Sequence, residues 1–210
     1  MRPLFVFVLA LLLAACNPTT ETPPPVRLDI YASPAAGPWL NEAFTCAAQR
    51  GILLGVANGP DEADLSLRIG EPPALLTPAY QVDLEEILVI THRESPVQNL
   101  TAEGARDLFR GVGDPSVQVW VYASGEDVQQ AFDQLLMGGE PVTSLARLAT
   151  SPQEMSDVLN AEVNTVGILP RHWKVGTVRE VYSAGTVPVL AIVKSEPEGA
   201  LRSLIACLQK

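Results

Sequence analysis

Two serines follow near-identical strand patterns and could together hold an anion. Segments 26–33 and 117–124 each alternate apolar and polar residues and end in Tyr-Ala-Ser, at Ser33 and Ser124. A predicted helix follows each serine, and the first backbone amides of a helix lack partners and carry partial positive charge. Such amides and a serine hydroxyl can bind a small anion. The pair predicts one ligand site shared by two facing units or, alternatively, two serines that only cap helices.

Enzymatic chemistry finds little support in the sequence. The two histidines, His92 and His172, are isolated, and there is no nucleophile elbow or glycine-rich phosphate loop. No His, Cys and carboxylate cluster has the spacing of a metal site. Glu85-Glu86 and Gly70-Glu71 are more typical of a solvated edge and a turn than of an acid/base pair. We therefore expect a protein that is not an enzyme and has neither cofactor nor metal.

The N-terminus is typical of an exported protein. Arg2 precedes an apolar run over 4–15, too short for the about 20 residues that span a bilayer. The string Leu-Ala-Ala before Cys16 resembles a bacterial lipobox, which implies a signal peptide over 1–15 and an acylated Cys16. The proline-rich segment 16–25 would then be a tether to the extracytoplasmic face of a bacterial membrane. The alternative is an ordinary secretory signal that is cut near Ala15.

The net charge of the chain limits the classes of partner that it can bind. The chain has a formal net charge of −10, which argues against binding to nucleic acid or to an anionic membrane surface. A small anionic ligand remains compatible, because local dipoles rather than net charge decide what a pocket binds.

Strand and helix patterns alternate along the body, which predicts an α/β class with mostly parallel sheets. Strands are predicted at 26–31, 52–57, 63–69, 86–91, 117–123, 166–169, 178–182 and 187–193. Helices are predicted at 35–49, 101–110, 126–137, 151–160 and 197–208, with Thr101 and Ser151 as N-caps.

Four motifs in a shared order resemble a known family. Segment 87–101 is similar to its strand and Asn-Leu-Thr loop, and 107–111 to its helix that ends in phenylalanine and glycine. Ser124-Gly125 resembles its serine-glycine-threonine ligand loop, and 164–168 one of its strands. The family is that of extracytoplasmic solute-binding proteins, in the phosphate-binding branch of the type II class. The resemblance covers about 26–210.

The resemblance implies a compact, two-lobed type II periplasmic-binding-protein fold with a hinge. Lobe 1 would comprise 26–90 and 187–210, and lobe 2 would comprise 91–186. The protein would capture a small anionic ligand, a phosphate-like oxyanion or an acidic solute, between its lobes for an ABC-type uptake transporter. The expected ligand-binding residues are Ser33, Pro34, Arg68, Ser124, Gly125, Glu126 and Thr165.

The sequence departs from the family at the ligand loop. Glu126 replaces the threonine after serine-glycine, and Trp120 and Tyr122 stand where an arginine is usual. A carboxylate beside phosphate would repel it. Arg68 could replace the missing arginine, or it could be a surface strand residue. These departures favour the alternative, a non-transport relative that acts as a sensor or protein-interaction lipoprotein, whereas the paired serines favour solute capture.

Two cysteines remain once Cys16 is lipidated, namely Cys46 and Cys207. An even number of cysteines in an exported chain suggests a disulfide. In the expected topology the closing helix returns to lobe 1, beside the helix that carries Cys46. The alternative is two buried free thiols.

Overall fold

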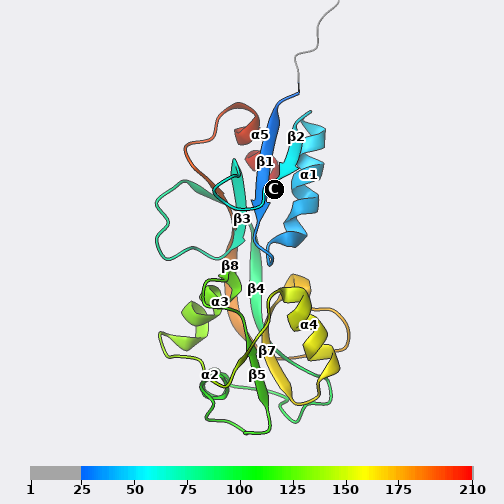
Figure 1. Cartoon of the computed structure of the whole chain (residues 1–210), viewed down its shortest axis with the longest axis vertical. Helices are drawn as coiled ribbons and strands as arrows, with labels where there is room; N and C mark the ends of the chain where they lie inside the picture. The colour runs from blue at the N-terminus through cyan, green and yellow to red at the C-terminus, as the bar shows by residue number, and fades with distance from the viewer. Residues whose placement is uncertain (1–24, 210) are drawn as a thin grey trace, which may run out of the picture.

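The structure, a computed structural model, describes residues 25–209 and shows two lobes arranged end to end (Figure 1). The predicted signal peptide and Cys16 lie outside the described residues. Within 25–209, no helix is both long enough and apolar enough to cross a membrane.

One mixed sheet runs through both lobes, in the strand order β2-β1-β3-β8-β4-β7-β5-β6. The first lobe holds three mutually parallel strands, β1 (Arg27–Ala32), β2 (Leu53–Val56) and β3 (Leu65–Ile69). The second lobe holds another parallel set, β5 (Gln118–Val121), β6 (Arg147–Leu148) and β7 (Thr165–Pro170).

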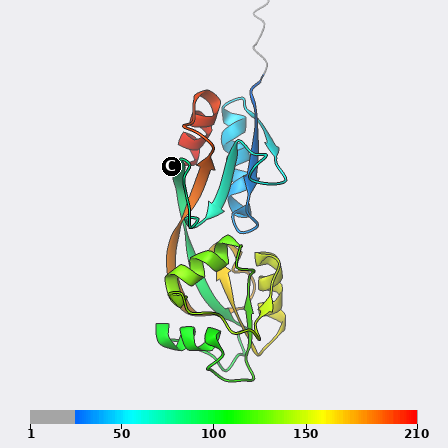
Figure 2. The ribbon, with the colours of Figure 1, turned by 60° about the vertical axis from the view of Figure 1, so that its left-hand side comes forward.

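Two long strands connect the lobes, β4 (Ala79–Thr91) and β8 (Arg179–Val193) (Figure 2). They pair with each other in antiparallel fashion along their length, with register shifts that mark irregularities. Together they form the β4–β8 ribbon. The C-terminal part of β8 pairs with β3 of the first lobe, and the C-terminal part of β4 pairs with β7 of the second lobe. The expectation of mostly parallel sheets is confirmed within each lobe but not for the connecting strands, which run antiparallel to each other and to the neighbouring strands β3 and β7.

Helices cover the sheet in each lobe. The first lobe carries α1 (Leu40–Gln49) and α5 (Gly199–Leu208). The second carries α2 (Ala102–Arg110), α3 (Asp127–Phe132) and α4 (Pro152–Ala161). The predicted N-caps of two helices are confirmed, because Thr101 Oγ1 accepts from Gly104 N at 3.1 Å and Ser151 Oγ accepts from Glu154 N at 3.1 Å.

Two predicted helices are shorter or less regular than expected. The helix expected over 35–49 begins as a 3-10 turn, Gly37–Trp39, before α1. The helix expected over 126–137 is α3 followed by a π-helical turn, Asp133–Met137. Phe132 of α3 packs against Phe109 of α2 with ring centroids 4.6 Å apart, so α3 is held in the core of the second lobe.

The helices α1 and α5 lie side by side on the first lobe (Figure 1). A disulfide joins Cys46 of α1 to Cys207 of α5, with the Cα atoms 5.9 Å apart. This separation lies within the roughly 4.4–6.8 Å that such bonds require. The closing helix is thereby tied to the first helix of the same lobe.

Candidate ligand-binding cleft

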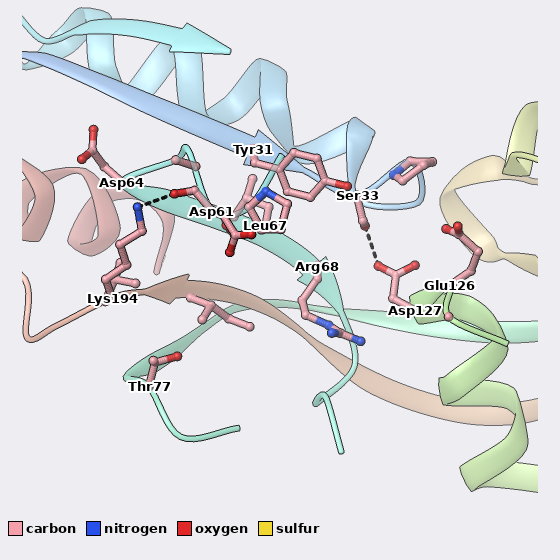
Figure 3. A pocket seen from close by; sticks show the side chains of 17 residues that line it. Tyr31, Ser33, Asp61, Asp64, Leu67, Arg68, Thr77, Glu126, Asp127 and Lys194 are labelled. Carbon is pink, nitrogen blue, oxygen red and sulfur yellow. Dashed lines mark hydrogen bonds between the residues drawn. The ribbon is translucent and has the colours of Figure 1, made fainter. Parts of the chain in front are cut away.

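A cavity of about 450 Å³ lies where the two lobes meet. The first lobe contributes the carboxyl ends of β1 and β3, and the second lobe contributes the loop that enters α3 (Figure 3). Ligand pockets commonly have volumes of about 300–1,000 Å³ and lie outside the carboxyl ends of parallel strands. The position and volume of this cavity are therefore those of a small-molecule cleft.

A hydrogen bond between Ser33 and Asp127 crosses from one lobe to the other. Ser33 follows β1 and is 9% exposed, while Asp127 is the first residue of α3 and is 6% exposed. Ser33 Oγ donates to Asp127 Oδ2 at 2.5 Å (Figure 3) and accepts from Ala36 N at 3.2 Å. Asp127 Oδ2 also accepts from Ile69 N of β3 at 2.9 Å. A carboxylate of the second lobe is thus bound by a hydroxyl and an amide of the first.

Arg68 of β3 lies in the same region, half-buried. Its Nη2 donates to Gln130 Oε1 of α3 at 3.0 Å, which is another contact between the lobes. Burial lowers the pKa of the Arg68 guanidinium, and the negative charge of Asp127 acts in the opposite direction. Because the ordinary pKa of arginine is so high, the group stays cationic. Arg68 therefore supplies positive charge to the neighbourhood of the Asp127 carboxylate.

The remaining charges of the cleft are mostly negative. Asp61, Asp64 and Glu126 line it in addition to Asp127, against two cations, Arg68 and Lys194 (Figure 3). This excess of carboxylates disfavours entry of a free anion unless its charge is offset by a cationic group of the same solute.

Two of these groups are held by backbone contacts. Lys194 Nζ donates to the carbonyl oxygen of Asp61 at 2.7 Å, and Asp64 Oδ2 accepts from Asp29 N at 2.8 Å. The carboxylates of Asp61 and Glu126 border the open cavity. Among residues 25–209, no group of three or more His, Cys, Asp or Glu is arranged to hold a metal ion.

Five of the residues expected at the ligand site line this cavity, and two do not. The five are Ser33, Pro34, Arg68, Gly125 and Glu126.

Ser124 and Thr165 are placed elsewhere. Ser124 lines a separate shallow depression with Tyr122 and Gln129. The alternative, in which Ser124 only caps its helix, is wrong as well, because Glu126 is the N-cap residue of α3. Thr165 is buried in β7, where its hydroxyl donates to Glu162 O at 2.6 Å.

The positions that hold an arginine in the phosphate-binding branch face the protein interior here. Trp120 and Tyr122 are 8% and 3% exposed, and neither lines the cleft. Tyr122 OH donates to Ile168 O at 3.0 Å, and burial, followed by the charges of Asp127 and Glu126, raises the pKa of this phenol. Both side chains are therefore part of the second lobe's core.

Further interlobe contacts, away from the cleft, come from the 3-10 turn Arg171–Trp173. Trp173 Nε1 donates to Ala35 O at 2.9 Å, and the His172 ring lies 4.6 Å from that of Trp39. His172 Nδ1 also lies 2.7 Å from Glu85 Oε2, whose carboxylate is buried. His172 is thus engaged in contacts outside the cleft.

Sequence reasoning missed Asp127, which accepts two hydrogen bonds from the opposite lobe. Its only local signal is its place as an acidic first residue of a helix, which is a common stabilising arrangement. The partners Ser33 and Ile69 are distant in sequence and meet Asp127 only in the folded chain.

No family model matches the chain, and no curated protein matches it. Solved structures do. A Clostridium perfringens protein assigned as a phosphate ABC transporter substrate-binding protein, solved with bound phosphate, aligns with a TM-score of 0.75 and 16% identity over 87% of this chain and 92% of its own. An ABC-type phosphate transport receptor from Vibrio cholerae aligns with a TM-score of 0.67 and 16% identity over 87% and 93%.

Regulatory domains share the same architecture. The CcmR regulatory domain of Synechocystis PCC6803, solved in complex with 2-PG, aligns with a TM-score of 0.66 and 13% identity over 87% of this chain and 95% of its own. At such identities the likeness concerns the fold alone. The chain therefore has a compact, two-lobed type II periplasmic-binding-protein-like fold.

Proposed function

We propose that this chain is a solute-binding protein that captures a small polar solute in the cleft between its lobes. The observation that carries the proposal is the cavity of about 450 Å³ lined from both lobes, beside the two connecting strands. In this proposal Ser33, Pro34 and Arg68 contact the solute from the first lobe, and Gly125 and Glu126 from the second. A change in the β4–β8 ribbon would open and close the cleft as a hinge.

We further propose an extracytoplasmic, membrane-anchored setting. A lipid on Cys16 and the tether over 16–25 would hold the body near the outer face of a bacterial membrane, where an ABC-type permease would receive the solute. Lobe 1 would comprise 26–90 with 187–210, and lobe 2 would comprise 91–186. The chain would then cross between the lobes twice, once along β4 and once along β8.

The charges of the cleft favour a solute that carries both signs. An acidic group would contact Arg68 or Lys194, and an amino group would contact the carboxylates of Asp61 and Glu126. A free oxyanion is disfavoured, because two like unit charges about 4 Å apart near a protein surface repel by about 4 kcal/mol. Within the expected anionic class, an acidic solute with an amino group therefore fits better than inorganic phosphate.

A thermal-shift screen of the full chain in mild detergent tests this function. The panel contains amino acids, dicarboxylates, polyamines, sugars and inorganic phosphate. A solute present at about 100 times its Kd stabilises a one-site protein by about 2.7 kcal/mol. We expect one or a few amino-bearing acids to raise the Tm in a saturable manner. Stabilisation by phosphate alone would contradict the proposed solute class, and no response to any class would contradict solute binding.

The alternative function is a sensor or protein-interaction lipoprotein. The observation in its favour is the Ser33–Asp127 hydrogen bond, which joins the lobes through protein atoms alone. Such a connection suits a body that presents a fixed surface to a partner. A negative screen, combined with retained fold and membrane attachment, would support this alternative.

A further inference from the structure

Several groups suited to binding an anion converge on one carboxylate of the chain itself. The Ser33 hydroxyl and the Ile69 amide both donate to Asp127 Oδ2, at 2.5 and 2.9 Å. The guanidinium of Arg68 interacts electrostatically with the same carboxylate. Hydroxyl, amide and guanidinium donors are the groups with which proteins bind free carboxylates and phosphates.

Asp127 accepts the hydrogen bonds of the Ser33 hydroxyl and the Ile69 amide, whereas the Arg68 guanidinium donates to Gln130 and acts on the carboxylate through its charge. Its second oxygen, Oδ1, accepts from Val128 N at 2.9 Å, so both oxygens are hydrogen-bonded and the residue is buried. Asp127 also lines the cleft, so its carboxylate lies at the boundary between the protein and the cavity. A free anion that approached Ser33 and Ile69 would have to displace a carboxylate that is covalently attached and therefore always present.

We propose that Asp127 is a specificity-determining residue that acts as an internal anion, occupying the oxyanion position of the cleft and excluding free oxyanions from it. The inference deepens the proposed function and rests on it, since it assumes that the solute binds in this cleft. The solute then binds in the rest of the cavity and does not receive the hydrogen bonds that the Ser33 hydroxyl and the Ile69 amide give to Asp127. Because the carboxylate belongs to α3 and its donors to the first lobe, Asp127 also positions α3 against β3.

Chemical rescue distinguishes an internal anion from an ordinary buried aspartate. Replacing Asp127 with alanine removes the carboxylate, and formate has the shape and charge of the group that is lost. The test measures Tm by tryptophan fluorescence on the full chain in mild detergent, with formate or inorganic phosphate added at constant ionic strength balanced by chloride.

We expect Asp127→Ala to have a lower Tm than the wild type and to regain stability as formate is added. At about five times its Kd, formate should raise the Tm by about 2–4 °C. The wild type should not respond, and neither should Asp127→Asn, whose amide fills the same space. Phosphate should likewise stabilise only Asp127→Ala, because the vacated position opens into the cavity.

Two matched variants control for charge. Glu126→Ala removes one carboxylate from the same cleft, and Asp133→Ala removes one from the same helical segment outside it. Both should be insensitive to formate. The proposal is overturned if neither anion stabilises Asp127→Ala, or if Glu126→Ala responds equally. Should the alanine variant fail to fold, Asp127→Ser is measured in the same way and judged by the same outcomes.

This experiment is separable from the test of the proposed function. It uses formate and phosphate on variants, whereas the function is tested with a solute panel on the wild type. If no solute stabilises the wild type but formate stabilises Asp127→Ala, solute binding is contradicted and the role of Asp127 as an internal anion is supported. If a solute stabilises the wild type but neither anion stabilises Asp127→Ala, solute binding is supported and the internal anion is contradicted.

Discussion

Removing the disulfide between α1 and α5 should destabilise the protein strongly. The bonded cysteines are separated by 161 positions in the sequence, so the bond closes a loop that contains most of the folded body. In the chain-entropy model, a cross-link over such a loop stabilises the folded state by about 5 kcal/mol, by restricting the unfolded chain. We therefore expect Cys46→Ala/Cys207→Ala to lose several kcal/mol of unfolding free energy and about 10–20 °C of Tm.

Urea denaturation followed by tryptophan fluorescence measures this loss. Chemically reduced wild type is the matched control, because it lacks the cross-link and keeps both sulfur atoms, and it should resemble the double variant. Mass spectrometry of the unreduced wild type should show a protein lighter by two hydrogen atoms than the reduced form. A stability loss below about 1 kcal/mol, or two free thiols before reduction, would refute the reasoning.

Three further outcomes concern the hinge, the second lobe and the anchor. Hydrogen bonds from Arg171 and, to a lesser extent, Ser183 lower the pKa of Glu86 from its ordinary value of 4.5. The stability that Glu86 contributes is therefore present above pH 4.5 and is lost as the pH falls through the lower folded pKa. Glu86→Gln should flatten this dependence of the unfolding free energy on acid pH. Gly167→Ala should cost about 1–3 kcal/mol in urea denaturation, since the added Cβ would lie 2.5 Å from Met155 Sδ. Cys16→Ser should release the protein from the membrane fraction, and unchanged fractionation with membranes would contradict lipidation.

Local signals in the sequence were enough to predict much of the fold. The alternation over 63–69 corresponds to β3, and the polar residues Thr101 and Ser151 cap helices as expected. Capping depends on a side chain and an amide three residues away, so both partners are visible in one short segment.

The connecting ribbon was harder to predict, because its strands are stabilised by each other. The sequence suggested separate strands at 178–182 and 187–193, whereas β8 continues through Gly185. Glycine weakens an isolated strand, but here β4 pairs with β8 on both sides of it, with Ile87 opposite Gly185. The start of β4 does alternate apolar and polar residues over 80–85, but the prolines at 72, 73 and 78 suggested an irregular segment, so the strand was predicted only from 86.

The candidate site was predictable in part. Ser33 was selected as a serine between a strand and a helix, and Arg68 as a cation that could replace the arginine of the resembled family; both line the cleft. The prediction for Ser124 was wrong, because the chain makes a further turn between Ser124 and the start of α3 at Asp127. Asp127 could not be selected, since its partner Ser33 lies 94 positions away and only the folded chain brings them together.

The most direct test of solute capture between the lobes is a calorimetric titration of the best solute from the screen into cleft-blocked protein. Gly125 lines the cleft, and a Cβ added there would have no atom within 4 Å, so Gly125→Trp should fill the cavity with little strain. Gln98→Trp, at an exposed loop position of the second lobe outside the cleft, is the control for a bulky substitution. We expect one solute per chain in the wild type and in Gln98→Trp, and no binding heat in Gly125→Trp. Undiminished binding to Gly125→Trp would show that the solute is held elsewhere and would contradict the proposed cleft.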